Sequence, residues 1–213
     1  MQLVSVQTGR PKQLVDADGA RWTTAFGKAP VQGAVKLRTL GLEGDGVADK
    51  RYHGGVDMAV LAYSADHYPE WRTLLSRPEL PLGGFGENLS VLGATEESVY
   101  LGDVWSIGGA RLQVASPRKP CSAISRFSGI PDLLKRVEKS GRIGWYLRVL
   151  EEGPLEAGQE VRLVERPHPD WSVARAMRVG RARKKDPAAA RALIECAALS
   201  ERWKAWLRDE ARV

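Results

Sequence analysis

The sequence predicts a mainly β protein, built as a closed barrel or sandwich and followed by a small unit of three helices. Nine short runs with strand character recur over the first 165 residues, each bounded by glycine, proline or other turn-forming residues. After Pro167 this pattern gives way to apolar residues at helical spacing. We therefore expect two parts, residues 1–165 and residues 166–213.

The expected strands are alternating or continuous apolar runs between turn signals. In chain order they cover residues 3–7, 21–26, 31–40, 58–63, 87–92, 104–107, 110–115, 144–150 and 160–164. Gly108 and Gly109 separate two of these strands and favour a two-residue hairpin, because that turn needs positive φ angles. Two helices are expected among the strands, at 66–75 and at 131–139, where Pro131 suits the first turn.

Three further helices are expected after Pro167. Asp170, Asp186 and Ser200 are each suited to cap one of them, because their side-chain oxygens accept from N–H groups of the first turn. The predicted helices cover residues 171–179, 188–197 and 201–211. Apolar residues recur at helical spacing in this region, so the helices are expected to share an apolar core.

Length and composition exclude several classes of protein. The chain has 213 residues, of which 43% are hydrophobic and 27% charged, as in a typical folded globular protein. No apolar run approaches the roughly 20 residues of a membrane span. The first residues lack the profile of a secretory signal peptide, so a cytoplasmic protein with no membrane partner is expected. Cys121 and Cys196 by themselves cannot form a disulfide framework or a four-ligand zinc site.

Positive charge is concentrated in the last fifth of the chain. From Trp171 onward there are 11 Lys and Arg against 5 Asp and Glu, an excess that equals the net charge of +6 for the whole chain. Such asymmetry is typical of a solvated helical face or of a unit that meets an acidic partner. Trp203 and Trp206 more simply build a small core than a stacking surface, so nucleic acid is disfavoured as a partner.

Cys121 is the first candidate for chemistry. It follows a predicted strand, in a loop that contains two prolines, and Arg118 and Lys119 place two positive charges close to it. Such neighbours favour the thiolate, which is both a nucleophile and a ligand for soft metals. The alternative is a half-buried structural cysteine. Cys196 lies on the apolar face of a predicted helix and is expected to be of that structural kind.

Two glycine-rich segments are the next candidates. Residues 41–55 contain five glycines and end in His53, Gly54 and Gly55. Loops of this kind direct backbone N–H groups at anions, and a histidine relays protons near neutral pH. In the second segment, residues 83–89, Asn88 offers both a donor and an acceptor. Taken alone, both segments are as well explained as turns. Asp45, Asp49, His53 and Asp57 resemble a cluster of hard-metal ligands, but carboxylates in a polar loop are usually solvated or cap turns, so no metal site is expected there.

In their order along the chain, the segments GLEGD, HGG, GENL, GD and SPRKPC resemble the MOSC domain family, named after the C-terminal domain of molybdenum cofactor sulfurases. The similarity is to its YiiM-like branch and covers nearly the whole chain. It implies a closed β-barrel over residues 1–165 and a three-helix extension over residues 166–213. It also implies a molybdenum cofactor of the molybdopterin type and the reduction of N-hydroxylated compounds.

The resemblance implies that Cys121 is the protein thiolate on molybdenum. The residues it places around the pterin and its phosphate are Arg118, Ser116, Asn88, His53, Gly54 and Gly55. His53 is also the candidate acid that protonates the leaving hydroxyl group. Electrons are expected from a redox partner protein, because no segment resembles a flavin, nicotinamide or iron–sulfur site. The basic helices are expected to dock that partner or to border the active site, and a homodimer is left open.

Two alternative functions remain open from the sequence. A sulfur-carrier module would hold a persulfide on Cys121 without any metal. A non-enzymatic binding protein would use its basic helical unit to engage a partner such as nucleic acid.

Overall fold

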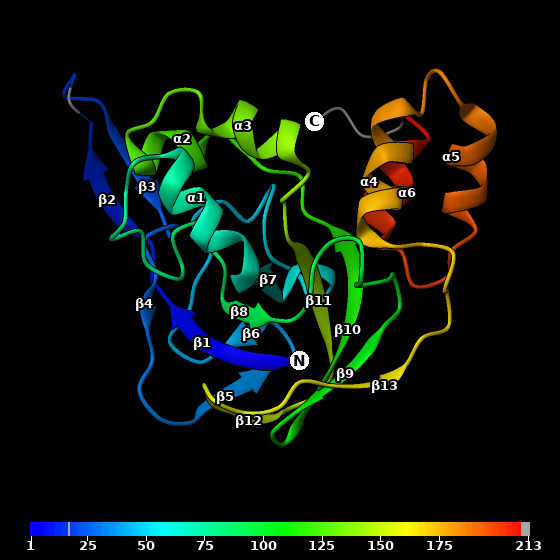
Figure 1. Ribbon diagram of the computed structural model, residues 1–213, viewed down its shortest axis with the longest axis horizontal. Coiled ribbons are helices and arrows are strands. Elements are labelled where there is room, and N and C mark those ends of the chain that lie inside the picture. Colours follow the sequence, from blue (N-terminus) through cyan, green and yellow to red (C-terminus); the bar gives the residue numbers. More distant parts are fainter. Residues whose placement is uncertain (17, 210–213) are drawn as a thin grey trace.

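A large curled sheet forms the body of the protein in the computed structural model, which describes residues 1–16 and 18–209 (Figure 1). Its eight strands follow the order β13-β9-β10-β11-β7-β8-β1-β4. All neighbours are antiparallel except β7 and β8, which are parallel. The strands are β1 (Gln2–Thr8), β4 (Ala29–Pro30), β7 (Val60–Ser64), β8 (Leu89–Leu92), β9 (Val104–Ile107), β10 (Ala110–Pro117), β11 (Trp145–Glu151) and β13 (Arg162–Glu165).

Two smaller sheets complete the β structure. One has the order β12-β5-β6 and the other is the hairpin β2–β3. Their strands are β2 (Lys12–Val15), β3 (Arg21–Thr24), β5 (Val35–Arg38), β6 (Gly41–Leu42) and β12 (Gly153–Leu155). The sequence pattern did not predict β2, β6 or β12, which are short and, for β2, largely exposed.

The large sheet curls so that β1 meets the chain just before β13. An isolated antiparallel bridge joins Gln2 of β1 to Glu160, just before β13. The Leu3 N–H also donates to the Gln159 carbonyl oxygen at 2.9 Å. The mainly β, barrel-like fold is therefore confirmed. The predicted hairpin is confirmed as well, because β9 and β10 pair Ile107 with Ala110 around Gly108, whose φ is 56°.

Residues 1–16 and 18–209 include six α-helices, which lie in two groups beside this body. Figure 1 shows α1–α3 together at one rim of the sheet and α4–α6 as a bundle beside β10. Among the described residues, no helix is long and apolar enough to cross a membrane. The helices are α1 (Tyr68–Leu74), α2 (Ala123–Ser128), α3 (Leu133–Ser140), α4 (Val173–Ala182), α5 (Pro187–Ile194) and α6 (Glu201–Leu207), and the short 3₁₀ turns η1 (Val56–Met58) and η2 (Ala65–His67) precede α1.

Two of the three predicted helix caps are confirmed. Asp186 and Ser200 accept from the N–H groups of Ala189 and Trp203, as predicted. The predicted cap at Asp170 is wrong, because Ser172 is extended and accepts from Arg175 N at 3.1 Å. Similarly, the chain at Pro131 lies before α3 and not in its first turn.

The last predicted helix, 201–211, also differs from the structure at its end. In the described part of the chain α6 stops at Leu207. Residues 210 and 211 of the prediction lie outside the described residues.

One apolar core runs from the barrel into the helical bundle. Trp105 and Trp145 are fully buried inside the sheet, and Leu193 and Trp203 belong to the same continuous cluster. Trp203 of α6 also donates from Nε1 to the Pro117 carbonyl oxygen at 2.9 Å. The bundle is therefore anchored on the end of β10, next to the loop that contains Cys121.

Candidate functional site

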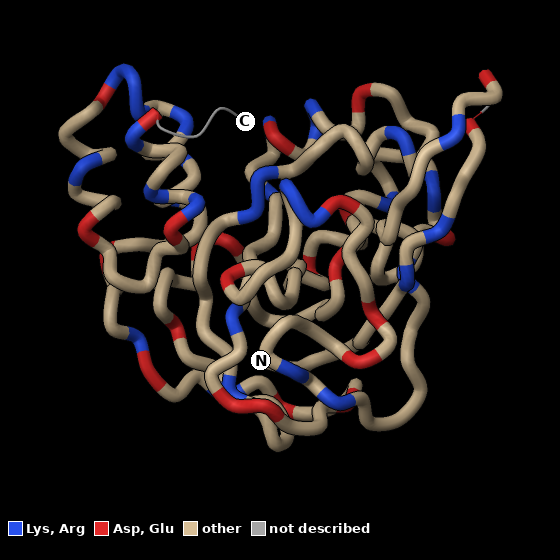
Figure 2. Tube along the Cα trace, turned by 180° about the vertical axis from the view of Figure 1, so that it is seen from behind, with Lys and Arg blue, Asp and Glu red and all other residues tan. Residues whose placement is uncertain are grey.

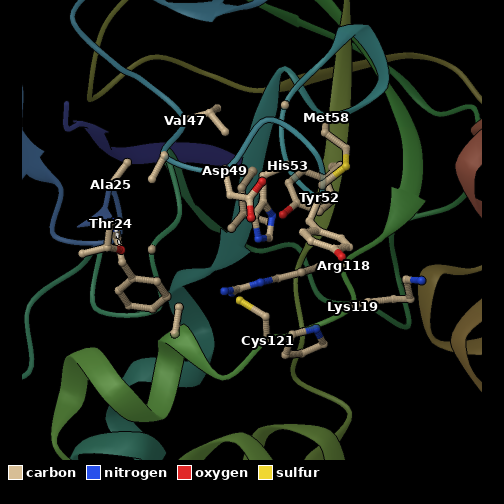
Figure 3. A pocket seen from close by; sticks show the side chains of 18 of the residues that line it. Thr24, Ala25, Val47, Asp49, Tyr52, His53, Met58, Arg118, Lys119 and Cys121 are labelled. Atoms are coloured by element: carbon tan, nitrogen blue, oxygen red, sulfur yellow. Dashed lines mark hydrogen bonds between the residues drawn. The ribbon is translucent and has the colours of Figure 1, made fainter. Parts of the chain in front are cut away.

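A cavity of about 770 Å³ lies between the β2–β3 hairpin, the loop before η1, the end of β10 and helix α6 (Figure 3). This volume is in the range of sites that hold a cofactor or a substrate of similar size. Among the residues predicted to form the site, those that line the cavity are Ser116, Arg118, Cys121, Asn88, His53 and Gly54. Gly55 is not among its lining residues and instead precedes η1 with φ 85°.

Cys121 lies in the turn between β10 and α2, with its side chain partly exposed to the cavity. Burial of the thiol opposes ionisation. A hydrogen bond with His53, the backbone N–H of Ala123 and the charge of Arg118 outweigh it, so the pKa of Cys121 is lowered. In Figure 3 the Cys121 sulfur, the Arg118 side chain and His53 lie side by side. The structure thus brings together three of the residues that the sequence singled out.

Arg118 is buried beside this thiol, with 4% of its surface exposed. The backbone N–H of Arg118 donates to the Gly144 carbonyl oxygen at 3.0 Å. This bond extends the pairing of β10 with β11 by one residue beyond the end of β10. The guanidinium Nη1 of Arg118 is fully buried and has no hydrogen-bond partner among the described residues. A buried N–H donor without a hydrogen-bond partner is costly, so Nη1 is arranged to receive an anion from the cavity.

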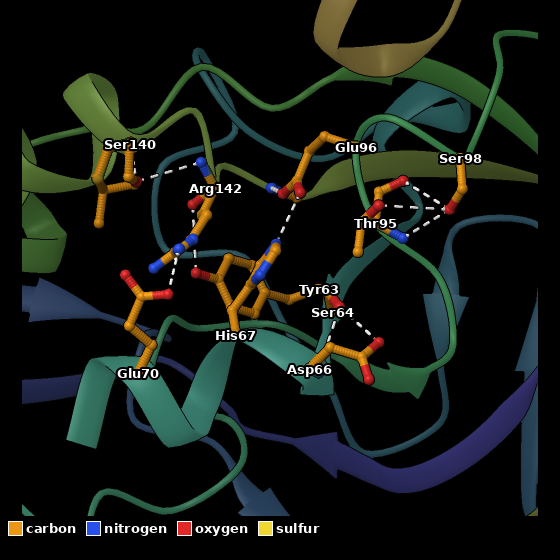
Figure 4. A network of polar contacts seen from close by, with 12 residues as sticks. Tyr63, Ser64, Asp66, His67, Glu70, Thr95, Glu96, Ser98, Ser140 and Arg142 are labelled. Atoms are coloured by element: carbon orange, nitrogen blue, oxygen red, sulfur yellow. Dashed lines mark hydrogen bonds and ion pairs between the residues drawn. The ribbon is translucent and has the colours of Figure 1, made fainter. Parts of the chain in front are cut away.

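Glu96 and His67 form a pair within a network of polar contacts (Figure 4). Glu96 accepts from Gly144 N at 2.8 Å through one carboxylate oxygen and contacts His67 Nε2 at 2.7 Å through the other. Because the Gly144 carbonyl holds the Arg118 N–H, this pair sets the position of the arginine. The sequence reasoning did not find Glu96 or His67, since no local pattern links residues that are 29 positions apart.

Asn88 joins three parts of the chain at the floor of the cavity. Its Oδ1 accepts from Leu61 N at 3.1 Å, and its Nδ2 donates to Asp45 Oδ2 at 2.8 Å and to the Gln7 carbonyl at 3.2 Å. Asp45 also accepts from Gly9 N at 2.8 Å and pairs with Lys28. Since both Asn88 amide hydrogens are engaged, this residue frames the cavity, and its expected contact to a ligand stays a prediction.

His53 is carried by the loop between β6 and η1. The backbone N–H of His53 donates to the Asp49 carbonyl oxygen at 3.0 Å, and this bond closes a tight turn. Gly54 follows with φ 79°, a conformation that L side chains rarely adopt, and a Cβ at this position would lie 3.2 Å from Val47. The two glycines of the HGG segment are therefore explained by the turn that presents His53 to the cavity.

The acidic residues near His53 have protein partners. Asp57 pairs with Arg148 at 2.9 Å, and Asp45 pairs with Lys28. Asp49 accepts from Arg51 N at 2.9 Å. In the described part of the chain, His, Cys, Asp and Glu side chains form no group of three or more that could hold a metal ion.

Helix α6 supplies one wall of the cavity that sequence reasoning missed. Ser200, Arg202 and Trp203 line it, although they lie far from Cys121 in the sequence. On the opposite side, Trp22 and Phe26 come from the segment that begins with β3. The one sequence signal for α6 was the excess of positive charge in the last three helices, and that excess did not identify Arg202 in particular.

The two cysteines are expected to differ in reactivity toward iodoacetamide at neutral pH. The lowered pKa of Cys121 increases its thiolate fraction, whereas burial raises the pKa of Cys196. Cys196 is also only 3% exposed. Peptide mass spectrometry of the folded protein should therefore find Cys121 alkylated well before Cys196. Equal rates, or faster modification of Cys196, would contradict the environment described for Cys121.

Comparison with known proteins places this fold and cavity in a family. The model of the MOSC domain matches residues 49–162, and that of the YiiM-like 3-alpha helix domain matches residues 171–209. The protein YflK of Bacillus subtilis is 41% identical over 203 residues, which cover 95% of this chain and 91% of YflK.

Two further relatives extend the comparison. A protein of Gibberella moniliformis named "Reductase" is 39% identical over 186 residues, which cover 85% of this chain and 32% of that protein. The crystal structure of YiiM from Geobacillus stearothermophilus superimposes with a TM-score of 0.83 at 33% identity and covers 98% of each chain. The chain therefore belongs to the MOSC domain family and carries the three-helix extension of its YiiM-like members.

Proposed function

We propose that the protein binds a molybdenum cofactor of the molybdopterin type through Cys121 and reduces N-hydroxylated compounds. One observation carries this proposal: a single cavity is lined by both Cys121 and Arg118. The pKa of Cys121 is lowered, and the buried Nη1 of Arg118 has no hydrogen-bond partner among the described residues. The family supports this proposal, since the MOSC domain takes its name from molybdenum cofactor sulfurases.

The residues present fit such a cofactor. A single thiolate is a soft ligand that suits a metal already held by an organic dithiolene, and it would not suffice for a metal ion bound by protein ligands alone. The unpartnered guanidinium of Arg118 suits the cofactor's phosphate. The cavity of about 770 Å³ leaves room for both a cofactor and part of a substrate.

The side chains of the cavity would then have separate roles. Cys121 would ligate the metal, Arg118 and Ser116 would hold the anionic part of the cofactor, and His53 would carry a proton at its imidazole. When bound, the cofactor supplies the two-electron chemistry of the reduction. Conversion of R–NHOH to R–NH₂ consumes two electrons and two protons and releases water, so a proton from His53 to the leaving hydroxyl accounts for one of the two protons.

The reductase-named relative supports an oxidoreductase role. The matched region makes up 32% of that protein, so the remaining two thirds lie outside the part shared with this chain. We infer that in this protein the electrons come from a separate redox protein, because the segments present include no resemblance to a flavin or iron–sulfur site.

The basic turn between α4 and α5 is our candidate for docking that redox protein. Figure 2 shows this turn as a basic stretch at the outer end of the helical bundle. Arg183 forms an ion pair with Asp209 at 2.9 Å, and its guanidinium group lies over the Trp206 ring. The centroid of the same ring is 4.6 Å from the Lys119 ammonium group. Lys184 and Lys185 are exposed. The exposed lysines therefore offer charge to an acidic partner, and Trp206 links the turn to a residue of the cavity wall.

Reversal of Lys184 and Lys185 to Glu should slow turnover with the protein donor and spare turnover with a small chemical reductant. The effect should be larger at low ionic strength, because surface charges are less screened there. Steady-state rates with both donors, measured at low and high salt, check this. Equal slowing with both donors, or no slowing with either, would contradict docking at this turn.

The proposed activity is tested by assaying reduction of an N-hydroxylated base with a chemical reductant. Protein from a host that makes the molybdenum cofactor should form the amine, and protein from a cofactor-deficient host should not. Amine formation at equal rates by both preparations would contradict the proposal. If neither preparation is active and Cys121 of the purified protein carries a persulfide, the sulfur-carrier function replaces it.

A further inference from the structure

Helix α6 reaches across the cavity to the loop that carries His53. Arg202 Nη2 donates to the Arg51 carbonyl oxygen at 2.8 Å, and its Nη1 donates to the Tyr52 carbonyl oxygen. Nη1 also contacts Met58 Sδ at 3.7 Å. One guanidinium group thus holds two consecutive carbonyls immediately before His53, together with the residue that ends η1.

The residues next to His53 in this loop are either exposed or glycines. Arg51 and Tyr52 are exposed, and Gly54 and Gly55 follow with positive φ angles, so the backbone on both sides of His53 is poorly fixed by packing. Within the loop, the His53 N–H to Asp49 carbonyl bond closes a single turn. The contact from α6 to two consecutive carbonyls therefore restrains the position of this histidine from outside the loop.

The same helix also holds the cysteine side of the site. Trp203 Nε1 donates to the Pro117 carbonyl oxygen at 2.9 Å, and Ser200 N donates to the Ala115 carbonyl oxygen at 2.9 Å. Residues 202 and 203 are neighbours in α6, yet one fixes the loop of His53 and the other fixes the strand that leads to Cys121. A single helical turn therefore sets the spacing between the two loops.

We propose that Arg202 is a positioning residue of the site: by holding the carbonyls of Arg51 and Tyr52 from α6, it fixes His53 beside Cys121 in the cavity. The three-helix extension is then part of the active site and not only an appendage on the barrel. The reaction roles of His53 and Cys121 rest on the proposed function, but the contact that Arg202 maintains does not.

Arg178 provides a matched control for this proposal. It also ties the helical bundle to the barrel region, through an ion pair with Glu97 at 2.8 Å. Its side chain is 64% exposed and does not line the cavity. Arg178→Met therefore removes a tether of the bundle without touching either loop of the site.

The test measures the rate at which iodoacetamide modifies Cys121 at neutral pH, in cofactor-free protein with the background change Cys196→Ser. His53 lies with Cys121 in the cavity and lowers the pKa of its thiol, so displacement of His53 should slow the reaction. We expect Arg202→Met to slow the reaction roughly fivefold, the effect of losing one ordinary hydrogen bond. Arg202→Lys should restore part of the rate, and Arg178→Met should leave it unchanged.

The double variant His53→Ala, Arg202→Met shows whether Arg202 acts on Cys121 through His53 or directly through its own charge. In a His53→Ala background, Arg202→Met should cause no further slowing, because the imidazole that Arg202 positions is already absent. Equal slowing in the presence and absence of His53 would overturn the proposal, and so would an unchanged rate in Arg202→Met.

Hydrogen exchange gives a second readout for the same variants. Amides of residues 49–55 should exchange faster in Arg202→Met than in the parent, while those of β1 and β8 stay protected. If Arg202→Met does not fold, Arg202→Gln replaces it, and normal exchange of 49–55 in that variant would overturn the proposal. These measurements need neither cofactor nor substrate, so a failure of the proposed reductase activity would leave their result unaffected.

Discussion

Cys121→Ser is expected to reduce turnover of an N-hydroxylated substrate to the background rate while leaving the fold intact. Oxygen replaces sulfur at nearly the same size, but a hydroxyl group is a hard, protonated donor and does not replace a soft thiolate ligand. Cys121 is only partly buried, so we expect the free energy of unfolding to change by less than about 1 kcal/mol. Turnover with a chemical reductant and a urea-unfolding curve measure the two quantities.

Cys196→Ser is the matched control for that experiment. Cys196 is buried in the core of the helical bundle, so the hydroxyl should cost about 1–2 kcal/mol of stability. Its activity should equal that of the parent protein. A Cys121→Ser protein that retained turnover would remove Cys121 from the role of ligand.

Arg118→Met should have opposite effects on stability and on cofactor retention. Without cofactor, Nη1 of Arg118 is a buried donor with no partner in the described part of the chain. Replacing a buried donor that lacks a hydrogen-bond partner with an apolar side chain of similar length should raise the free energy of unfolding by about 1 kcal/mol. The loss of a charge-assisted bond to phosphate should weaken cofactor binding by about 2 kcal/mol, roughly thirtyfold.

Thermal unfolding of the cofactor-free proteins and cofactor content after gel filtration measure these two effects. Arg126→Met is a suitable control, because Arg126 also lines the cavity but is paired with Asp16 at 2.6 Å. If Arg118→Met retained as much cofactor as the parent, the phosphate-binding role of Arg118 would be wrong.

The features predicted from sequence were those whose cause is local. The hairpin at Gly108 and the caps at Asp186 and Ser200 depend on residues within a few positions of each other. The surroundings of Cys121 were predicted for the same reason, since Arg118 is three residues away. Asp170 failed as a cap because a second capping residue, Ser172, stands two positions later in the chain.

The features that the sequence did not reveal depend on contacts between distant segments. Arg202 and Arg51 are 151 positions apart, and Asn88 and Asp45 are 43 apart. No spacing rule connects such residues before the fold brings them together. Sequence reasoning therefore singled out Cys121 and His53 but not the helix whose Arg202 contacts the loop of His53.

The glycine-rich segment before β8 illustrates how a motif can be structural. Glu87 is fully buried and accepts from Gly83 N at 2.8 Å and from Ser90 Oγ at 2.9 Å, and it also accepts from the Tyr68 hydroxyl. Burial is the first cause that raises the pKa of Tyr68, and the charge of Glu87 is the second. This carboxylate stabilises the turn that leads to Asn88, and it does not line the cavity.

Molybdenum content is the most direct measure of cofactor binding through Cys121. The protein is purified from a host that makes the cofactor and from a cofactor-deficient host, and the metal is quantified per chain together with the pterin. We expect near-stoichiometric molybdenum and pterin in the first preparation, neither in the second, and loss of both in Cys121→Ser from the first host. Molybdenum far below stoichiometry in the parent protein from both hosts would contradict this cofactor binding.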